Sequence, residues 1–119
     1  MTVPGYLASG LHLLADLHGV DPVLLRDAAA IEALLRRAAL AAGARILHGH
    51  FHRFGEGGGV TGVLLLAESH ISIHTWPEAG FAALDIFMCG EARPRVALEV
   101  VEAELGAGAC ALRSIVRGV

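Results

Sequence analysis

Side chains that could take part in chemistry are concentrated between residues 68 and 89. They interrupt segments whose other residues are typical of buried β-strands, and they are Glu68, Ser69, His70, Ser72, His74, Thr75, Trp76, Glu78, Asp85 and Cys89. Burying such groups costs free energy unless each finds a partner, and conflicts of this kind are enriched at functional sites. Strand alternation would also place His70, Ser72 and His74 on one solvated face. The pattern alone leaves both interpretations open.

Three more histidines, His48, His50 and His52, stand at alternate positions further upstream. Three imidazoles on one face could bind zinc, but successive side chains on one flat strand lie roughly 7 Å apart and seldom converge on one ion. We therefore predict no metal site. The glycine-rich residues 55–59 lie between two predicted strands, a context that indicates a hairpin loop and not a phosphate-binding loop.

Periodicity and turn signals predict the elements that position these residues. A helix is predicted over residues 22–42, between Asp21 as N-cap and Gly43 as stop, and a second over residues 94–105. Strands are predicted over residues 7–17, 44–54, 60–67, 71–75, 81–88 and 109–116. This order indicates an α+β fold in one domain, residues 1–119, as a two-layer sandwich of mainly antiparallel sheet with two helices on one face.

Composition limits the classes of protein that fit. Apolar residues make up 55% of the 119 residues, but the apolar runs are far shorter than the ~20 residues of a membrane helix. So much apolar surface on a short chain predicts that a second subunit covers part of the sheet, although the sequence does not fix which face it covers. Nine scattered arginines and a net charge of −3 make nucleic acid an unexpected partner. Two cysteines and the absence of a signal-peptide pattern predict a cytoplasmic protein.

Three stretches of the sequence carry specific motifs. They are Phe51-His52-Arg53-Phe54, the run Ala-Glu-Ser-His-Ile-Ser-Ile-His-Thr-Trp-Pro-Glu over residues 67–78, and Cys89-Gly90-Glu91. These motifs resemble those of the small prokaryotic S-adenosylmethionine decarboxylases. The order of the other elements also fits, from Ser9-Gly10-Leu11-His12 to Arg117-Gly118, so the resemblance covers essentially the whole chain.

The resemblance implies a proenzyme that cleaves its own backbone between Glu68 and Ser69. The Ser69 hydroxyl would attack the Glu68 carbonyl to form an ester, and β-elimination and hydrolysis would leave a covalent pyruvoyl group at position 69. By the same resemblance, His74 would remove the Cα proton of residue 69. Thr61, where the family usually has serine, would assist the acyl shift. Cleavage would separate residues 1–68 from residues 69–119, the shorter and pyruvoyl-bearing piece.

The resemblance also implies the reaction and the substrate. The pyruvoyl cofactor would form a Schiff base with S-adenosylmethionine and accept the electrons left by departing CO2. Cys89 would be the proton donor, whereas Cys110 is expected to be an ordinary structural cysteine. Phe54 would stack on the adenine, and Glu78 would hold the ribose hydroxyls. The product would be the aminopropyl donor for spermidine in polyamine biosynthesis, and the expected assembly is a homodimer or a dimer of cleaved heterodimers.

Two residues depart from the family pattern. Leu11 stands where many members have arginine, and Ala79 replaces a common aromatic residue. Because some relatives act on ornithine or arginine, a pyruvoyl-dependent decarboxylase of those amino acids on the same scaffold is an alternative. A non-catalytic or unprocessed regulatory relative is a second alternative, and the presence of the expected serine, histidine and cysteine argues against it.

Overall fold

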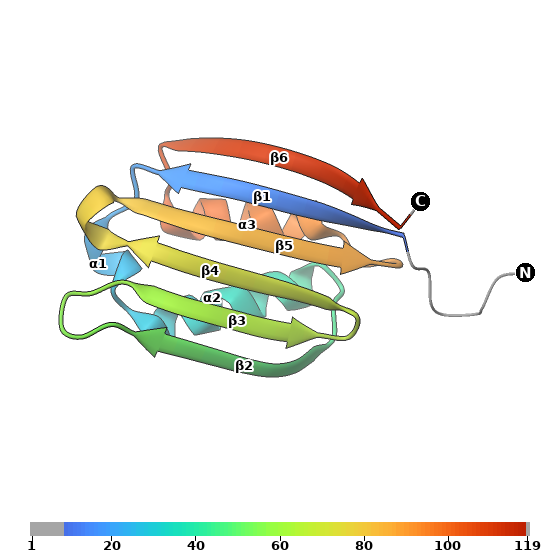
Figure 1. Cartoon of the computed structure of the whole chain (residues 1–119), viewed down its shortest axis with the longest axis horizontal. Coiled ribbons are helices and arrows are strands. Elements are labelled where there is room, and N and C mark those ends of the chain that lie inside the picture. The colour runs from blue at the N-terminus through green and yellow to red at the C-terminus, as the bar shows by residue number, and fades with distance from the viewer. Residues whose placement is uncertain (1–8, 119) are drawn as a thin grey trace, which may run out of the picture.

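The computed structural model describes residues 9–118, which form one six-stranded sheet with helices against one face (Figure 1). The strands are β1 (Gly10–His18), β2 (Ile46–Arg53), β3 (Val60–Leu66), β4 (Ser69–Trp76), β5 (Phe81–Cys89) and β6 (Ala109–Arg117). The helices are α1 (Pro22–Leu25), α2 (Ala28–Ala41) and α3 (Pro94–Leu105), and a 3₁₀ turn η1 (Pro77–Ala79) joins β4 to β5. The start predicted for the first strand, residues 7 and 8, lies outside the described residues.

The strands lie in the order β2-β3-β4-β5-β1-β6, and every neighbouring pair is antiparallel. The segments from β2 to β5 form a meander, and β1 lies between β5 and β6. The glycine-rich residues 55–59 join the antiparallel strands β2 and β3, as a hairpin loop should. This architecture confirms the predicted α+β two-layer sandwich with its antiparallel sheet.

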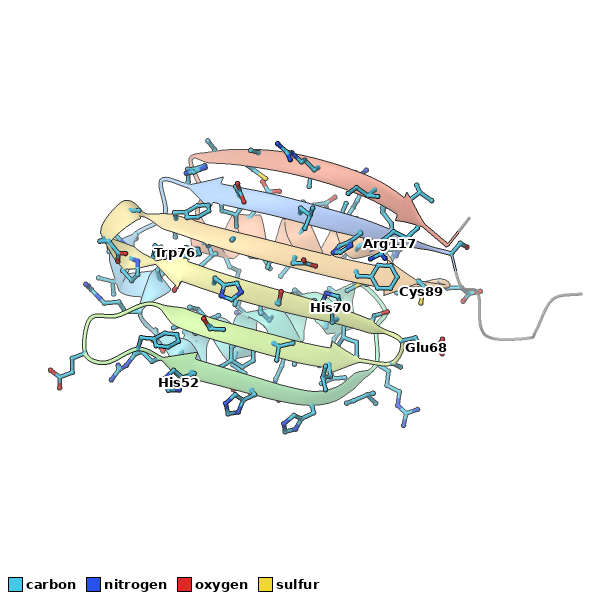
Figure 2. The ribbon with its side chains drawn as sticks, viewed as in Figure 1. His52, Glu68, His70, Trp76, Cys89 and Arg117 are labelled. Atoms are coloured by element: carbon cyan, nitrogen blue, oxygen red, sulfur yellow. The ribbon has the colours of Figure 1, made fainter. Side chains whose placement is uncertain are left out.

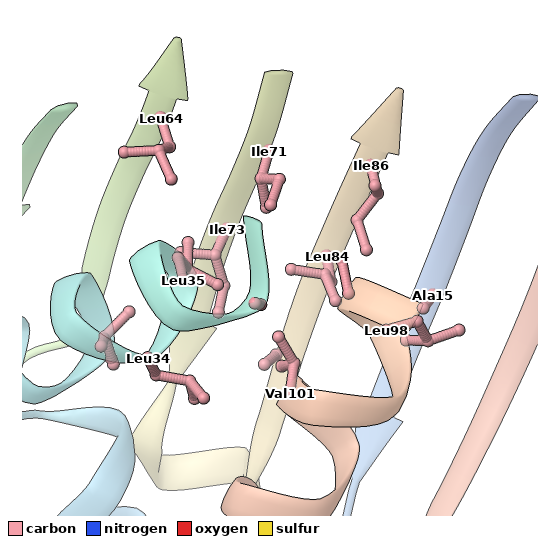
Figure 3. Close-up of a cluster of buried hydrophobic side chains, with 14 of the residues drawn as sticks. Ala15, Leu34, Leu35, Leu64, Ile71, Ile73, Leu84, Ile86, Leu98 and Val101 are labelled. Carbon is pink, nitrogen blue, oxygen red and sulfur yellow. The ribbon is translucent and has the colours of Figure 1, made fainter. Parts of the chain in front are cut away.

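The hydrophobic core lies between the sheet and the helices (Figure 3). Alternate residues of β5 are buried from Ala82 to Met88, because successive side chains of a strand point to opposite faces. The helices contribute Ile31, Leu35 and Val101, which are at most 1% exposed. Each large apolar side chain removed from water in this way stabilises the fold by about 1.5–3 kcal/mol. The core therefore fixes which face of every strand meets the helices.

The helix predicted over residues 22–42 is in fact two helices. Asp27 leaves the helical conformation, and its carboxylate accepts a hydrogen bond from the Ala30 N–H at 3.0 Å, which begins α2. Asp21 caps α1 in the same way through the Val23 N–H at 2.9 Å. Aspartate favours a helix start over a helix interior because its side chain competes for backbone donors. The prediction of one continuous helix was wrong because apolar periodicity does not reveal a second N-cap.

The other face of the sheet is not covered by any helix of the described residues and faces the viewer in Figure 1. We call it the open face. His70, Ser72 and His74 point toward it from β4, while the intervening residues are buried, so the predicted sharing of one face is confirmed. Asp85 and Phe87 of β5 share this face. Among residues 9–118, no helix is long and apolar enough to cross a membrane.

Candidate active site

The two-residue turn of Ala67 and Glu68 joins β3 to β4 and lies directly before Ser69. Leu66 and Ser69 are paired across the turn. Glu68 has a φ of 55°, the one positive value of a non-glycine residue in the described part of the chain. The left-handed region costs such a residue on the order of 1 kcal/mol or more. Conformational strain is therefore present at the residue whose carbonyl precedes Ser69.

Cys89 lies next to this turn at the end of β5. The register of β4 with β5, in which His70 pairs with Phe87, places Cys89 opposite Glu68 when it is continued by two residues. The Cys89 thiol donates a hydrogen bond to the Glu68 carbonyl oxygen, with 3.1 Å between Sγ and O. Figure 2 shows the two residues together at one end of the sheet. A donor in this place can stabilise negative charge that develops on the carbonyl oxygen.

Two cavities meet at Cys89. One, of about 330 Å³, has Glu68, Ser69 and Cys89 in its wall. The other, of about 570 Å³, is lined mainly by apolar residues from the start of β1, the end of β5 and the start of α3. The sulfur atom is thus next to space that could admit a small molecule. We call Glu68, Ser69 and Cys89 the cleavage cluster, after the cleavage between Glu68 and Ser69 that the sequence resemblance predicts.

A second group of predicted site residues lies at the opposite end of the sheet. Thr61, His74, Phe54 and Glu78 line a cavity of about 250 Å³, and we call them the hydroxyl–imidazole cluster. Thr61 and His74 are cross-strand partners, with Thr61 Oγ1 3.1 Å from His74 Nδ1. Phe54 is 59% exposed, and Glu78 is exposed in η1. An exposed aromatic ring and a carboxylate therefore flank a hydroxyl–imidazole pair.

Thr75 and Gly62 support this cluster from within the fold. Thr75 is buried, and its hydroxyl donates to the Leu25 carbonyl at 2.7 Å and accepts from the Val60 N–H at 2.8 Å. These bonds join β4 to α1 and to the start of β3. A Cβ atom on Gly62 would lie 2.0 Å from the ring of Phe51. The glycine therefore lets that ring lie across β3 on the core side of the sheet, one residue along the strand from Thr61.

One copy of the chain does not bring the two clusters together. Ser69 and His74 are five residues apart in β4, which is about 16 Å along an extended strand. Their side chains also belong to opposite faces of the sheet. His74 is on the open face, whereas Ser69 falls at the positions of β4 that face the helices. Figure 2 shows Glu68 and Cys89 near one end of the sheet and Trp76 near the other. The His74 of the same chain is therefore out of reach of residue 69.

Cys110 differs from Cys89 in place and in chemistry. Cys89 pairs with Gly10 at the start of β1, whereas Cys110 pairs with Leu17 near the end of the same strand. Burial, and to a smaller extent the negative charges of Glu102 and Asp16, raises the pKa of the Cys110 thiol above its ordinary value. Both cysteines are free. Cys110 is therefore poorly suited to give a reactive thiolate at neutral pH.

The structure also joins three residues that the sequence did not connect. His12 Nε2 lies 2.6 Å from Asp85 Oδ1, and His70 Nε2 lies 3.1 Å from the same oxygen. The sequence marked His70 and Asp85 as polar interruptions of buried strands. It gave no signal that His12 belongs with them, because only the order β4-β5-β1 brings the three strands side by side.

Comparison with known proteins identifies the family. A family model described as S-adenosylmethionine decarboxylase matches residues 11–118. The chain belongs to this family. The S-adenosylmethionine decarboxylase proenzyme of Prochlorococcus marinus (strain MIT 9313) is 48% identical over 109 residues, which are 91% of this chain and 86% of the relative. That of Pyrobaculum aerophilum is 42% identical over 104 residues, 87% of this chain and 83% of the relative.

The fold of this family is also found in a solved structure. The crystal structure of the adenosylmethionine decarboxylase from Aquifex aeolicus VF5 is similar with a TM-score of 0.86 and 36% sequence identity, covering 96% of this chain and 94% of that one. The S-adenosylmethionine decarboxylase family membership predicted from the motifs is therefore confirmed, and so is the fold class.

Proposed function

We propose that this chain is an S-adenosylmethionine decarboxylase proenzyme that cleaves itself between Glu68 and Ser69 and carries a pyruvoyl group at residue 69. The observation that carries the proposal is the hydrogen bond from Cys89 to the Glu68 carbonyl, in a strained turn immediately before a serine. Family membership supports it, since the sequence relatives are named proenzymes.

In the proposed cleavage, Ser69 Oγ attacks the carbonyl carbon of Glu68 and the peptide C–N bond breaks. The amide becomes an ester and the amino group of residue 69 is freed. Cys89 stabilises the negative charge on the carbonyl oxygen during this shift. Removal of the Cα proton of residue 69 by an imidazole then expels the Glu68 carboxylate and leaves dehydroalanine. Addition of water and loss of ammonia give the pyruvoyl group.

The residues around position 69 fit a pyruvoyl group. Such a group supplies a ketone that binds the substrate amine and withdraws the electrons left by departing CO2. Residue 69 would become a chain end beside the cavity of about 330 Å³. Cys89 lies in the wall of the same cavity, and we assign it the transfer of a proton to the product carbon once CO2 has left.

The hydroxyl–imidazole cluster supplies the recognition of a nucleoside in this proposal. The exposed ring of Phe54 offers an aromatic face to a purine, and the carboxylate of Glu78 accepts hydrogen bonds from the two ribose hydroxyls. Decarboxylated S-adenosylmethionine would then serve as the aminopropyl donor for spermidine. Because both cysteines are free, we place this reaction in a reducing compartment, the cytoplasm.

A second copy of the chain would unite the two clusters. We propose a homodimer in which two open faces pack together with their strands running in opposite directions. The two-fold axis would lie in the plane between the two sheets and perpendicular to β4. The start of β4 in one subunit would then lie over the end of β4 in the partner. The partner subunit's His74 would then lie over the backbone of residue 69, whose Cα proton it would remove, and the pairing would give two equal composite sites. Cleavage would turn each subunit into a heterodimer of residues 1–68 and 69–119.

Intact mass spectrometry and denaturing electrophoresis of the purified chain test the cleavage. We expect two pieces, 1–68 and 69–119, of which the second carries a ketone that borohydride reduces. Ser69→Ala should remain a single full-length species without activity. Ser72→Ala, at another serine of β4, is the matched control and should still cleave. A cleaved Ser69→Ala variant, or a full-length wild-type species that resists borohydride, would contradict the proposal.

Release of labelled CO2 tests the substrate separately. The cleaved protein should release CO2 from carboxyl-labelled S-adenosylmethionine and not from ornithine or arginine. Glu78→Gln should raise KM for S-adenosylmethionine because the amide accepts hydrogen bonds from the ribose less well. Release from ornithine or arginine alone would leave the cleavage chemistry in place and overturn the substrate.

A further inference from the structure

We propose that His12, His70 and Asp85 form a binding site for a divalent transition-metal ion of the zinc class. One ligand atom from each of these residues lies within 4.8 Å of the other two. The two Nε2 atoms lie 2.6 Å and 3.1 Å from Asp85 Oδ1. The inference does not depend on the proposed function, because none of the three side chains performs a step in it.

The convergence of these side chains follows from the strand register. His12 of β1 and His70 of β4 both pair with Phe87, from opposite sides of β5. Asp85 precedes Phe87 by two residues and shares the open face. Both imidazoles therefore reach diagonally across β5 to the same carboxylate, as three ligands from three adjacent strands.

Phe87 limits the freedom of the two imidazoles. Its ring centroid lies 5.6 Å from that of His12 and 6.1 Å from that of His70. The two imidazoles are perpendicular to each other, with an interplanar angle of 87°. Because the aromatic ring occupies the space on one side of them, both Nε2 atoms are directed to Asp85. Side chains held in this way lose little conformational entropy when an ion binds.

The charges around Asp85 favour a cation. Within residues 9–118 its ion-pair partners are the two histidines, which are charged only when protonated. Arg117, by contrast, stacks on the ring of Phe87, with its guanidinium carbon 5.8 Å from the ring centroid. Neutral imidazoles, the form that binds a metal ion, do not cancel the charge of a carboxylate. A bound cation would neutralise it.

The dimensions suit zinc chemistry. Zinc binds imidazole nitrogen and carboxylate oxygen at about 2.0–2.2 Å, which separates tetrahedral ligands by about 3.3 Å. The two nitrogen–oxygen distances need to widen by less than about 1 Å to reach that value. In the single chain the side chains of His12, Asp85 and His70 are 16%, 33% and 37% exposed, so in the proposed dimer a fourth ligand would come from the space between the two open faces. Figure 2 shows His70 on that face.

His48, His50 and His52 provide the internal comparison. They project from β2 at alternate positions of one strand, and they are exposed. Nothing brings them to a common point, since strand alternation spaces them by roughly 7 Å. Two neighbouring imidazoles and a carboxylate from separate strands are a better ligand set than three imidazoles in a row.

Cobalt(II) absorption spectroscopy and zinc competition on the untagged protein test the site. We expect one Co²⁺ per chain, with the intense visible bands of tetrahedral coordination and no sulfur-to-cobalt charge transfer, and displacement by Zn²⁺. His12→Gln and Asp85→Asn should each weaken binding by at least about tenfold. The matched control is His50→Gln, which removes one of the exposed histidines of β2. It should change the affinity for Co²⁺ by less than about twofold.

Three results would overturn the site. They are the absence of a tetrahedral Co²⁺ spectrum, a sulfur charge-transfer band that places the ion on a cysteine, and equal loss of binding in His50→Gln and His12→Gln. Circular dichroism of each variant shows whether the sheet is intact. If both single variants unfold, the double variant His12→Asn/His70→Asn is used, because its amides can still donate hydrogen bonds to Asp85 while binding zinc poorly.

Discussion

The sulfur atom of Cys89 has two neighbours that matter for chemistry. On one side its thiol donates to the carbonyl oxygen of Glu68, and on the other it borders the cavity beside Ser69. In the proposed function, one thiol would therefore assist the cleavage before it serves the decarboxylation. The two roles place different demands on the side chain, since the first needs a hydrogen-bond donor and the second needs a proton that can leave.

Substitution of Cys89 separates these roles. Cys89→Ala should slow cleavage by about tenfold, less than the loss of a strong oxyanion donor, because a thiol is a weak donor. The decarboxylation by the cleaved fraction should fall further than that. Cys89→Ser should cleave at close to the wild-type rate, since a hydroxyl can also donate to the carbonyl oxygen. Time courses of cleavage on gels, with activity per cleaved chain, make the measurement.

Equal cleavage rates in Cys89→Ala and the wild type would show that the contact with Glu68 is incidental. Loss of cleavage in both Cys89 variants would instead show a requirement for the sulfur atom itself. Either result would remove the donor role from the proposed cleavage.

Cys110 should react more slowly with alkylating agents than an unburied thiol. The raised pKa means that less of the nucleophilic thiolate is present at neutral pH, and the rate should increase up to a pH above that of a free cysteine. Iodoacetamide labelling followed by peptide mass spectrometry between pH 7 and about 10 measures this dependence. The labelling of free cysteine in the same buffers is the control. A Cys110 profile that coincides with it would contradict the effect of burial.

At the scale of the elements, Thr75 holds three segments together through one hydroxyl. Thr75→Val keeps the shape of the side chain but leaves the Val60 N–H and the Leu25 carbonyl without their partner. We expect the free energy of unfolding to fall by about 2–4 kcal/mol, since both groups are buried. Urea denaturation measures the change. Thr61→Val, at the partly exposed threonine of β3, is the control and should cost about 1 kcal/mol or less.

Gly62 is required by the packing of Phe51. Gly62→Ala forces a methyl group against the ring and should destabilise the protein by about 1–3 kcal/mol. The double variant Gly62→Ala/Phe51→Leu should lose less than the sum of the two single losses, because the smaller side chain relieves the clash. Thermal denaturation of the wild type, the two single variants and the double variant gives the coupling energy between residues 51 and 62. Strict additivity would show that the ring moves away without cost.

The sequence allowed the strands, the faces and the chemistry to be predicted, but not the distances between site residues. The period-2 pattern of β4 correctly placed His70 and His74 together, since alternation is a local property. The helix break at Asp27 was not predicted, because an aspartate that caps a helix would also fit the polar side of one longer helix. The contact of His12 with Asp85 depends on strand order, which hydrophobic periodicity does not contain.

At the scale of the whole molecule, the two clusters occupy opposite ends of one sheet. In the proposed function, the cleavage cluster would contain the bond to be broken, and the hydroxyl–imidazole cluster would contain the base and the nucleoside contacts. When two open faces pair with their strands in opposite directions, each subunit contributes to the other what it receives from it. Both composite sites therefore form at once. A pairing with parallel strands would instead place each cluster against its own copy and complete neither site.

Mixed dimers test this arrangement directly. Ser69→Ala and His74→Ala are each expected to be inactive alone. In a dimer of one with the other, the His74→Ala subunit keeps Ser69 and receives the partner subunit's His74, so one of the two sites is intact. Co-expression in equal amounts should therefore restore about one quarter of wild-type activity, from the half of dimers that are mixed. Mass spectrometry should find cleavage only in the His74→Ala chain.

The matched control combines Ser69→Ala with Cys89→Ala. Both changes lie in the cleavage cluster of their own subunit, so the mixed dimer holds one site without the serine and one without the cysteine, and no intact site forms. If both mixtures recovered activity, or if the His74→Ala chain stayed uncleaved beside Ser69→Ala, the reversed pairing would be wrong. Since no chain-internal motion short of unfolding moves His74 some 16 Å along its own strand, recovery in the first mixture alone requires a site shared between subunits.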